Sequence, residues 1–120
     1  MITSLSYNFC TVAIHDNYLI AVMNEGITVK PEHNEVLLNI VHKYYPNKPF
    51  GYITHRKHSY SVDPSIYFET SKINNLKAFA IVSVQKINEM NAELEKKFLK
   101  KPLKHFETLD DAVKWINEMI

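Results

Sequence analysis

Hydrophobic and polar positions alternate in the first part of the chain in a way that predicts two paired strands. Ser6 to Ile14 and Tyr18 to Met23 are rich in aromatic and β-branched residues, which favour strands. Asp16-Asn17 predicts a turn between them. Because this connection is short, we expect the two segments to form an antiparallel hairpin.

A helix is predicted to follow this hairpin. Pro31 suits a first helical position, and Glu32 and Glu35 would lie in the first turn, where the helix dipole favours acids. The apolar residues that follow recur at helical spacing and define one buried face: Val36, Leu37, Ile40, Val41 and Tyr44. Tyr45-Pro46-Asn47 is expected to end the helix.

The middle of the chain predicts a strand, a basic loop and a second helix. The aromatic and β-branched run from Phe50 to Ile53 is typical of a strand. His55 to His58 is a polar, largely cationic run that cannot be buried without partners. Asp63 is a good N-cap before Pro64, so we expect a helix from Pro64 to about Asn74.

The last third of the chain continues the alternation of strands and helices. Leu76 to Val84 is the longest apolar run and predicts a strand covered on both faces. A helix is expected from about Lys86 to Leu99, and a short strand from Leu103 to Phe106. Thr108 then predicts the cap of a final helix, with Asp111 as the acid of a capping box.

This order of elements predicts a single α/β domain, residues 1–120, with a mixed and mostly parallel sheet. In such sheets, ligands bind at the carboxyl ends of the strands. Those ends would carry Asn24 to Lys30, His55 to Asp63 and Ser83 to Lys86. The loop from His55 to Asp63 is therefore the first place to look for a site.

Composition excludes several classes of protein. The net charge of +1 gives no general attraction to nucleic acid or to a membrane surface. Cys10 is the one cysteine, so no internal disulfide can form, and a cytoplasmic protein is expected. No apolar run is long enough to span a membrane, and no leader-like segment opens the chain. With two glycines in total, the sequence has no Gly-rich phosphate loop.

The loop from His55 to Asp63 has the composition of a binding site for an anionic or amphipathic molecule. Cations close to the N-terminus of a helix suit an anion, and Tyr52 and Tyr60 could supply apolar walls. The candidate residues for binding a ligand or partner are His55, Arg56, Lys57, His58, Tyr60 and Asp63. The alternative is a solvated loop with ordinary helix capping.

Catalytic and metal sites are weaker alternatives. Ser59 or Ser61 with a histidine and Asp63 contains the residue types of a triad, but no glycine-flanked elbow surrounds either serine. His55 and His58 resemble metal ligands, but a His-x-x-His pair on a loop is a weak signal without further ligands. We therefore expect no enzyme, no metal and no cofactor.

Four segments of the chain resemble the SpoIIAA-like, or STAS-type, family of small proteins. They are AVMNEGITVKPEHNE, YITHRKHSYSVDPSIY, LKAFAIVS and EKKFLKKPLKHFETLDDAVKWI, and the likeness extends over nearly the whole chain. The resemblance implies a βα superhelix around a small mixed sheet, here with an N-terminal β-hairpin and about four helices. The better-understood STAS members are anti-sigma factor antagonists, and other members of the fold bind small anions, nucleotides or lipids.

The resemblance also implies a regulatory mechanism. Family members are switched by phosphorylation of a Ser or Thr in an Asp-Ser-Ser/Thr-Gly type sequence at the start of a helix. This chain has His-Ser-Tyr-Ser-Val-Asp-Pro there and lacks the glycine, which makes Ser61 the nearest equivalent and Ser59 the second. We therefore expect a non-enzymatic regulatory module with a protein partner. A small-molecule-binding domain is the alternative, and a homodimer paired through Ser6 to Ile14 is a further expectation.

Overall fold

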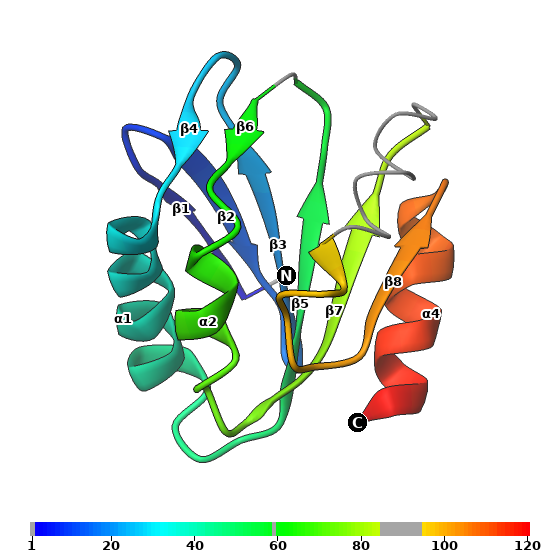
Figure 1. Cartoon of the computed structure of the whole chain (residues 1–120). Helices are drawn as coiled ribbons and strands as arrows, with labels where there is room; N and C mark the ends of the chain where they lie inside the picture. Colours follow the sequence, from blue (N-terminus) through cyan, green and yellow to red (C-terminus); the bar gives the residue numbers. More distant parts are fainter. Residues whose placement is uncertain (1, 59, 85–94) are drawn as a thin grey trace.

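The computed structural model describes residues 2–58, 60–84 and 95–120, and a six-stranded sheet lies at its centre (Figure 1). The strand order is β1-β2-β3-β5-β7-β8. These strands are β1 (Thr3–Ser6), β2 (Cys10–Ile14), β3 (Tyr18–Met23), β5 (Phe50–His55), β7 (Leu76–Val82) and β8 (Leu103–Phe106). The pairs β1–β2 and β2–β3 are antiparallel, and the other three neighbouring pairs are parallel. The predicted mixed, mostly parallel sheet is confirmed.

The N-terminal segment differs from the prediction, because the expected strand from Ser6 to Ile14 contains the last residue of β1, a turn and the whole of β2. The chain turns after β1, where the backbone N–H of Tyr7 donates to the carbonyl of Cys10 (2.8 Å). β2 pairs with β3 as the predicted hairpin, from Cys10↔Met23 to Ile14↔Leu19. Since β1 occupies its other side, β2 is an internal strand and has no free edge for a second copy. The edges of this sheet are β1 and β8.

The described residues contain three α-helices rather than about four. They are α1 (Asn34–Tyr44), which follows a single 3-10 turn η1 (Pro31–His33), α2 (Ile66–Thr70) and α4 (Leu109–Met119). Most of the helix expected from Lys86 to Leu99 lies outside the described residues. At the cap of α4, the hydroxyl of Thr108 accepts from the backbone N–H of Asp111, as the sequence predicted.

The second helix is shorter than predicted. Asp63 and Pro64 form a turn instead of a first helical turn, with Asp63 Oδ1 accepting from the backbone N–H of Ser65 (3.0 Å). Helix α2 therefore begins only at Ile66 and ends after five residues. Asp63 does act as a capping residue, but it caps the turn at Pro64 and Ser65 that precedes the helix.

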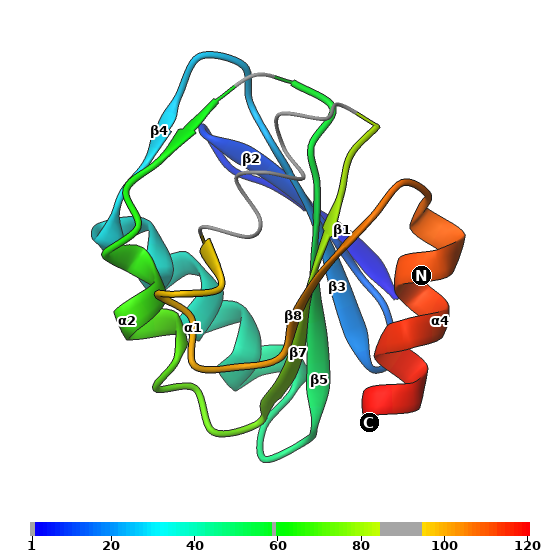
Figure 2. The same cartoon turned by 45° about the vertical axis from the view of Figure 1, so that its right-hand side comes forward.

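The helices lie on both faces of the sheet (Figure 2). Helices α1 and α2 cover one face, over the larger apolar core, and α4 covers the other face over a smaller core. Strand β5 is buried along almost its whole length because it lies between these layers. Gly51 in β5 lies so close to Ile116 of α4 that a Cβ atom would collide with the isoleucine side chain.

A second sheet, which was not predicted, lies at the carboxyl ends of the central strands. It consists of two parallel strands, β4 (Thr28–Val29) and β6 (Ser61–Val62). The backbone N–H of Asp63 donates to the carbonyl of Val29 (2.8 Å), which continues the pairing. This small sheet ties the segment after β3 to the segment after β5, and these are two of the loops that we expected to form the site.

Candidate ligand-binding site

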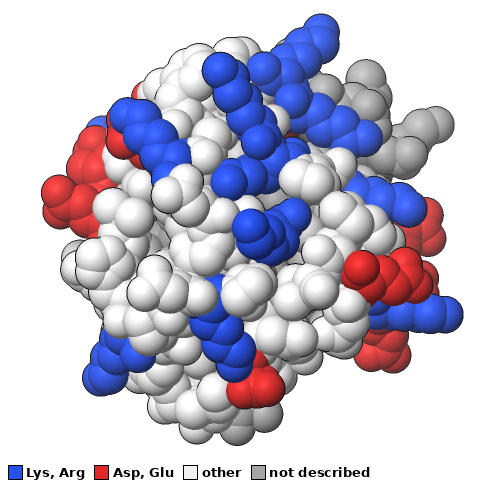
Figure 3. All heavy atoms as spheres, turned by 90° about the horizontal axis from the view of Figure 1, so that it is seen from below, with Lys and Arg blue, Asp and Glu red and all other residues white. Residues whose placement is uncertain are grey.

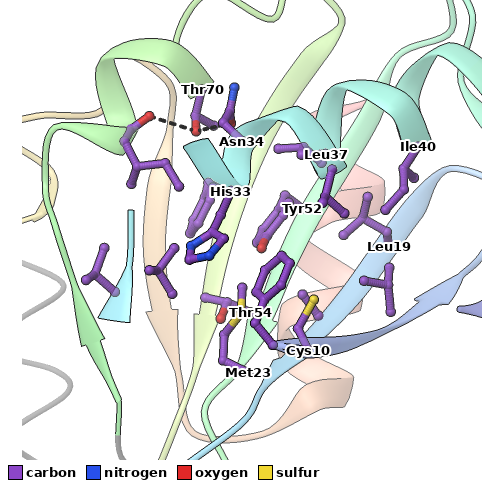
Figure 4. Close-up of a pocket in the computed structure, with 18 of the residues that line it drawn as sticks. Cys10, Leu19, Met23, His33, Asn34, Leu37, Ile40, Tyr52, Thr54 and Thr70 are labelled. Atoms are coloured by element: carbon purple, nitrogen blue, oxygen red, sulfur yellow. Dashed lines mark hydrogen bonds between the residues drawn. The ribbon is translucent and has the colours of Figure 1, made fainter. Parts of the chain in front are cut away.

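A cavity of about 60 Å³ lies between the central sheet and the helices α1 and α2 (Figure 4). Its lining from the sheet and the neighbouring segments is Phe9, Cys10, Val12, Leu19, Ala21, Met23, Val29, Tyr52, Thr54, Arg56, Tyr60, Val62 and Phe79. Its lining from the helical layer is His33, Asn34, Val36, Leu37, Ile40, Ile66, Tyr67 and Thr70. We call the partly exposed part of this lining the cavity mouth, and its residues are Phe9, His33, Val36, Arg56, Tyr60 and Val62.

The apolar wall follows from the alternation of side chains along β2 and β3. Every second residue of a strand points to the same face, so Cys10 and Val12 of β2 lie opposite Met23 and Ala21 of β3 in the cavity wall. Burial raises the pKa of the Cys10 thiol to about 11, so it stays protonated and acts as part of the apolar surface. Strands β2 and β3 thus present an apolar, uncharged surface to α1.

The polar end of the cavity is organised by a buried ion pair. Arg56 Nη2 lies 2.8 Å and 3.0 Å from the two carboxylate oxygens of Glu95. These two side chains are 6% and 11% exposed, so the pair is shielded from water. The Tyr67 hydroxyl donates to Glu95 Oε1 (3.1 Å), and Arg56 Nε donates to the Tyr60 oxygen (3.2 Å). Burial acts to lower the pKa of Arg56, but its interactions with Tyr60 and Glu95 raise that pKa.

Further hydroxyl groups around the cavity are also paired within the protein. The Tyr60 hydroxyl lies 3.0 Å from the Thr54 hydroxyl, so the hydrogen bonds around the ion pair extend to β5. On the helical side, the Thr70 hydroxyl lies 2.9 Å from Asn34 Oδ1 and joins α2 to α1 (Figure 4). These contacts provide partners for polar groups whose burial without a hydrogen bond would destabilise the protein.

Tyr52 is the exception among the hydroxyl groups that line the cavity. Its side chain reaches into the cavity, its ring stacks on Phe79 with centroids 4.6 Å apart, and the residue is 9% exposed (Figure 4). No hydrogen bond joins its hydroxyl to any residue in the described part of the chain. Burial, followed by the nearby Tyr60, raises the pKa of Tyr52, so this group is a phenol that can donate.

The structure separates the predicted binding residues into two groups. Arg56 and Tyr60 line the cavity, with the Arg56 guanidinium 5.6 Å from the centre of the Tyr60 ring. Lys57 and His58 are exposed and do not line it. His55 ends β5, and its pKa is lowered by burial and by the charge of Lys57.

Of the other predicted residues, Ser61 and Asp63 flank Val62, which lines the cavity. Ser61 is exposed in β6, and Ser59 lies outside the described residues. Asp63 Oδ1 accepts from both the backbone N–H and the hydroxyl of Ser65, and these hydrogen bonds lower the pKa of the carboxyl group. Asp63 Oδ1 therefore makes its hydrogen bonds within its own turn.

Sequence reasoning missed Glu95, Tyr67 and Thr54. Glu95 is followed by lysines and reads as a solvated acid, because nothing near it in sequence indicates that its partner is Arg56. The interaction spans 39 positions of the chain, so no local pattern could have revealed it. Thr54 continues the alternation of β5 after Tyr52, which was the one available signal.

A basic surface lies at the opposite end of the sheet. Figure 3 shows Lys and Arg side chains gathered on the face seen from below. Lys77 and Lys101 belong to this end, where burial and then the charge of Lys77 lower the pKa of Lys101. Lys48 and Lys72 are paired with Asp16 and Glu69, each at 3.2 Å. This surface is separate from the cavity.

Comparison with solved structures identifies the architecture. An uncharacterised protein from Shewanella loihica PV-4, of the DUF3478 family, has a crystal structure with a TM-score of 0.59 to this chain. The match covers 93% of this chain and 98% of that one at 15% sequence identity, and that protein is described as having a SpoIIAA-like fold. This chain has a SpoIIAA-like fold.

The resemblance read from the sequence is therefore confirmed at the level of the SpoIIAA-like fold. No model of a known protein family matches the chain, and neither does any curated protein. Among the described residues, none of the helices of this SpoIIAA-like domain has the length and apolar character needed to cross a membrane.

Proposed function

We propose that this protein is a non-enzymatic binding module that takes a small, largely apolar molecule into the cavity beneath α1. The observation that supports this is the cavity itself, which is walled by aliphatic, aromatic and thiol groups and has its polar groups at one end. Binding sites for small molecules commonly combine an apolar wall with a few placed polar groups.

Xenon binding followed by NMR tests this proposal directly. Xenon is an uncharged probe that enters apolar cavities. We expect it to shift the backbone resonances of Ala21, Leu37 and Tyr52, which line the cavity from three elements. If the shifts were spread over the surface or absent, the proposed function would be wrong.

A matched pair of variants makes the test specific. Ala21→Val adds two methyl groups to the cavity wall and should abolish the xenon-induced shifts. Ala13→Val makes the same change on the half-exposed opposite face of the same sheet and should leave them unchanged. A cavity signal that persisted in Ala21→Val would place the bound xenon elsewhere.

The regulatory role expected from the sequence stays a second proposal, in which a protein partner reads the surface around Ser61. The exposure of Ser61 in β6, close to the cavity mouth, supports it. Phosphorylation there would add negative charge beside the loop that contains Lys57. Mass spectrometry of protein purified from its own cells would test this, and unmodified Ser61 without a stoichiometric partner would count against it.

A further inference from the structure

The free hydroxyl of Tyr52 indicates what the ligand of the cavity carries. No fully buried polar side-chain atom of the described residues lacks a partner, so the unpaired Tyr52 hydroxyl keeps accessible surface beyond the ring that stacks on Phe79. The neighbouring hydroxyls of Tyr60 and Tyr67 are both hydrogen-bonded within the protein. The Tyr52 hydroxyl therefore differs from them in being available to a molecule inside the cavity.

Arg56 supplies a second set of donors to the same cavity. Its Nε and Nη2 groups bind Tyr60 and Glu95, and no acceptor for Nη1 is found in the described ranges. An arginine side chain can only donate. A ligand group that faces these donors must therefore accept hydrogen bonds, as the oxygen of a carbonyl group does.

The charge balance of the site favours an uncharged ligand. Of the side chains lining the cavity in the described residues, Arg56 is the permanent cation, and Glu95 already neutralises it. A carboxylate in this cavity would lie near the Glu95 carboxylate and would lose its hydration without a free counter-charge. His33 also lines the cavity, and because its Nδ1 accepts from the backbone N–H of Lys30, this uncharged tautomer carries its ring proton on Nε2.

The volume of the cavity limits the size of the group it accepts. A cavity of about 60 Å³ is well below the roughly 150 Å³ of an engineered cavity that binds benzene. It matches a short aliphatic chain and does not match a ring. The mouth at Phe9 and Tyr60 would allow a longer molecule to extend outward from this end.

Resting on the proposed function, we infer that the cavity binds an uncharged carbonyl compound with a short aliphatic chain, whose oxygen accepts a hydrogen bond from Tyr52. This differs from the anionic ligand expected from the basic loop, because Arg56 is neutralised and Lys57 and His58 lie outside the cavity. The class includes ketones, aldehydes and esters with about three or four carbon atoms in the buried part.

NMR titration of the full chain at neutral pH tests this inference with three probes. Butanone carries the neutral acceptor, butanoate carries a charged head on a similar chain, and xenon reports on the apolar cavity alone. We expect butanone to bind at least severalfold more tightly than butanoate. In Tyr52→Phe we expect butanone binding to weaken about two- to tenfold, the range for one lost hydrogen bond, with xenon binding unchanged.

Tyr18→Phe is the matched control, because Tyr18 belongs to the smaller core on the opposite face of the sheet. It should bind all three probes like the unmodified protein. Tyr52→Phe should also unfold at the same or a slightly higher denaturant concentration, since it removes no hydrogen bond found among the described residues.

The outcomes separate the inference from the proposed function. Two results would overturn the inference: tighter binding of butanoate than of butanone, or equal binding of butanone by Tyr52→Phe and the unmodified protein. If xenon still bound in the cavity, the proposed function would stand. Failure of xenon and both organic probes to perturb the cavity residues would overturn the proposed function and the inference together.

Discussion

At the scale of single residues, the buried pair of Arg56 and Glu95 is a contact whose disruption should be costly. Both charges are almost completely buried, and each has further hydrogen bonds, to Tyr60 and Tyr67. A buried pair of this kind contributes little net stability, but loss of one partner leaves an uncompensated charge. The pair therefore fixes the position of the β5 end more than it strengthens the fold.

Glu95→Gln should lower the free energy of unfolding by about 3–5 kcal/mol, because Arg56 would remain buried without its counter-charge. Urea denaturation of the two proteins measures this difference. The double variant Arg56→Met with Glu95→Leu should recover much of the loss, since apolar residues can replace a buried pair. Equal stability of Glu95→Gln and the unmodified protein would mean that the pair is solvated.

His55 gives a prediction about pH. Burial, and then Lys57, lower its pKa in the folded protein below the value of about 6.5 expected in the unfolded chain. The unfolded state therefore binds more protons in this range, so stability should fall as the pH drops below about 6.5. Denaturation at pH 7.5 and pH 5.0 should show a smaller loss in His55→Gln than in the unmodified protein. An unchanged pH dependence would show that His55 does not contribute.

At the scale of elements, the contact between α4 and β5 depends on the absence of a side chain at Gly51. The Ile116 side chain occupies the space that a Cβ atom would need. Helix α4 can therefore approach the central strand closely, and Ala78 and Ala80 of β7 continue this small-residue surface. The sequence shows the glycine but not the helix that requires it.

Gly51→Ala should destabilise the protein by about 1–3 kcal/mol through overpacking against Ile116. In an Ile116→Ala background the same substitution should cost much less, because the clash is removed. Urea denaturation of the four proteins in this cycle gives the coupling between the two positions. Additive effects would show that α4 adjusts its position instead.

At the scale of the whole molecule, ligand binding should be visible as thermal stabilisation. A ligand that binds only the folded state, at ten times its dissociation constant, adds about 1.4 kcal/mol. For a domain of this size that corresponds to a rise in Tm of about 3–8 °C. We expect this for butanone with the unmodified protein and not with Ala21→Val, measured by calorimetry. An equal shift in both proteins would indicate binding outside the cavity.

The arrangement of strands also changes the expectation about self-association. Strand β2 is enclosed between β1 and β3, so a homodimer through Ser6 to Ile14 is ruled out as a strand pairing of β2. β1 is the edge on that side, and it is short and mostly polar, which is typical of protected edges. A homodimer by another surface stays a prediction.

The amino-acid sequence by itself determined the order and type of most elements. The β2–β3 hairpin, α1, β5, β7, β8 and the Thr108 cap of α4 follow from local alternation, helical spacing and capping residues. It also placed Arg56, Tyr60 and Tyr52 near one site, because the carboxyl ends of parallel strands share an edge. These features depend on neighbouring residues, and local patterns record them.

The tertiary structure alone decided which groups surround the candidate site. Glu95 neutralises Arg56 across 39 positions, and the pairing of β4 with β6 joins Thr28 and Val29 to Ser61 and Val62. The cavity is the space left between side chains from several elements, so its volume belongs to no single segment. For this reason the basic run from His55 to His58 predicted an anionic ligand. In the folded protein, Glu95 neutralises Arg56, and the Tyr52 hydroxyl at the cavity has no partner among the described residues.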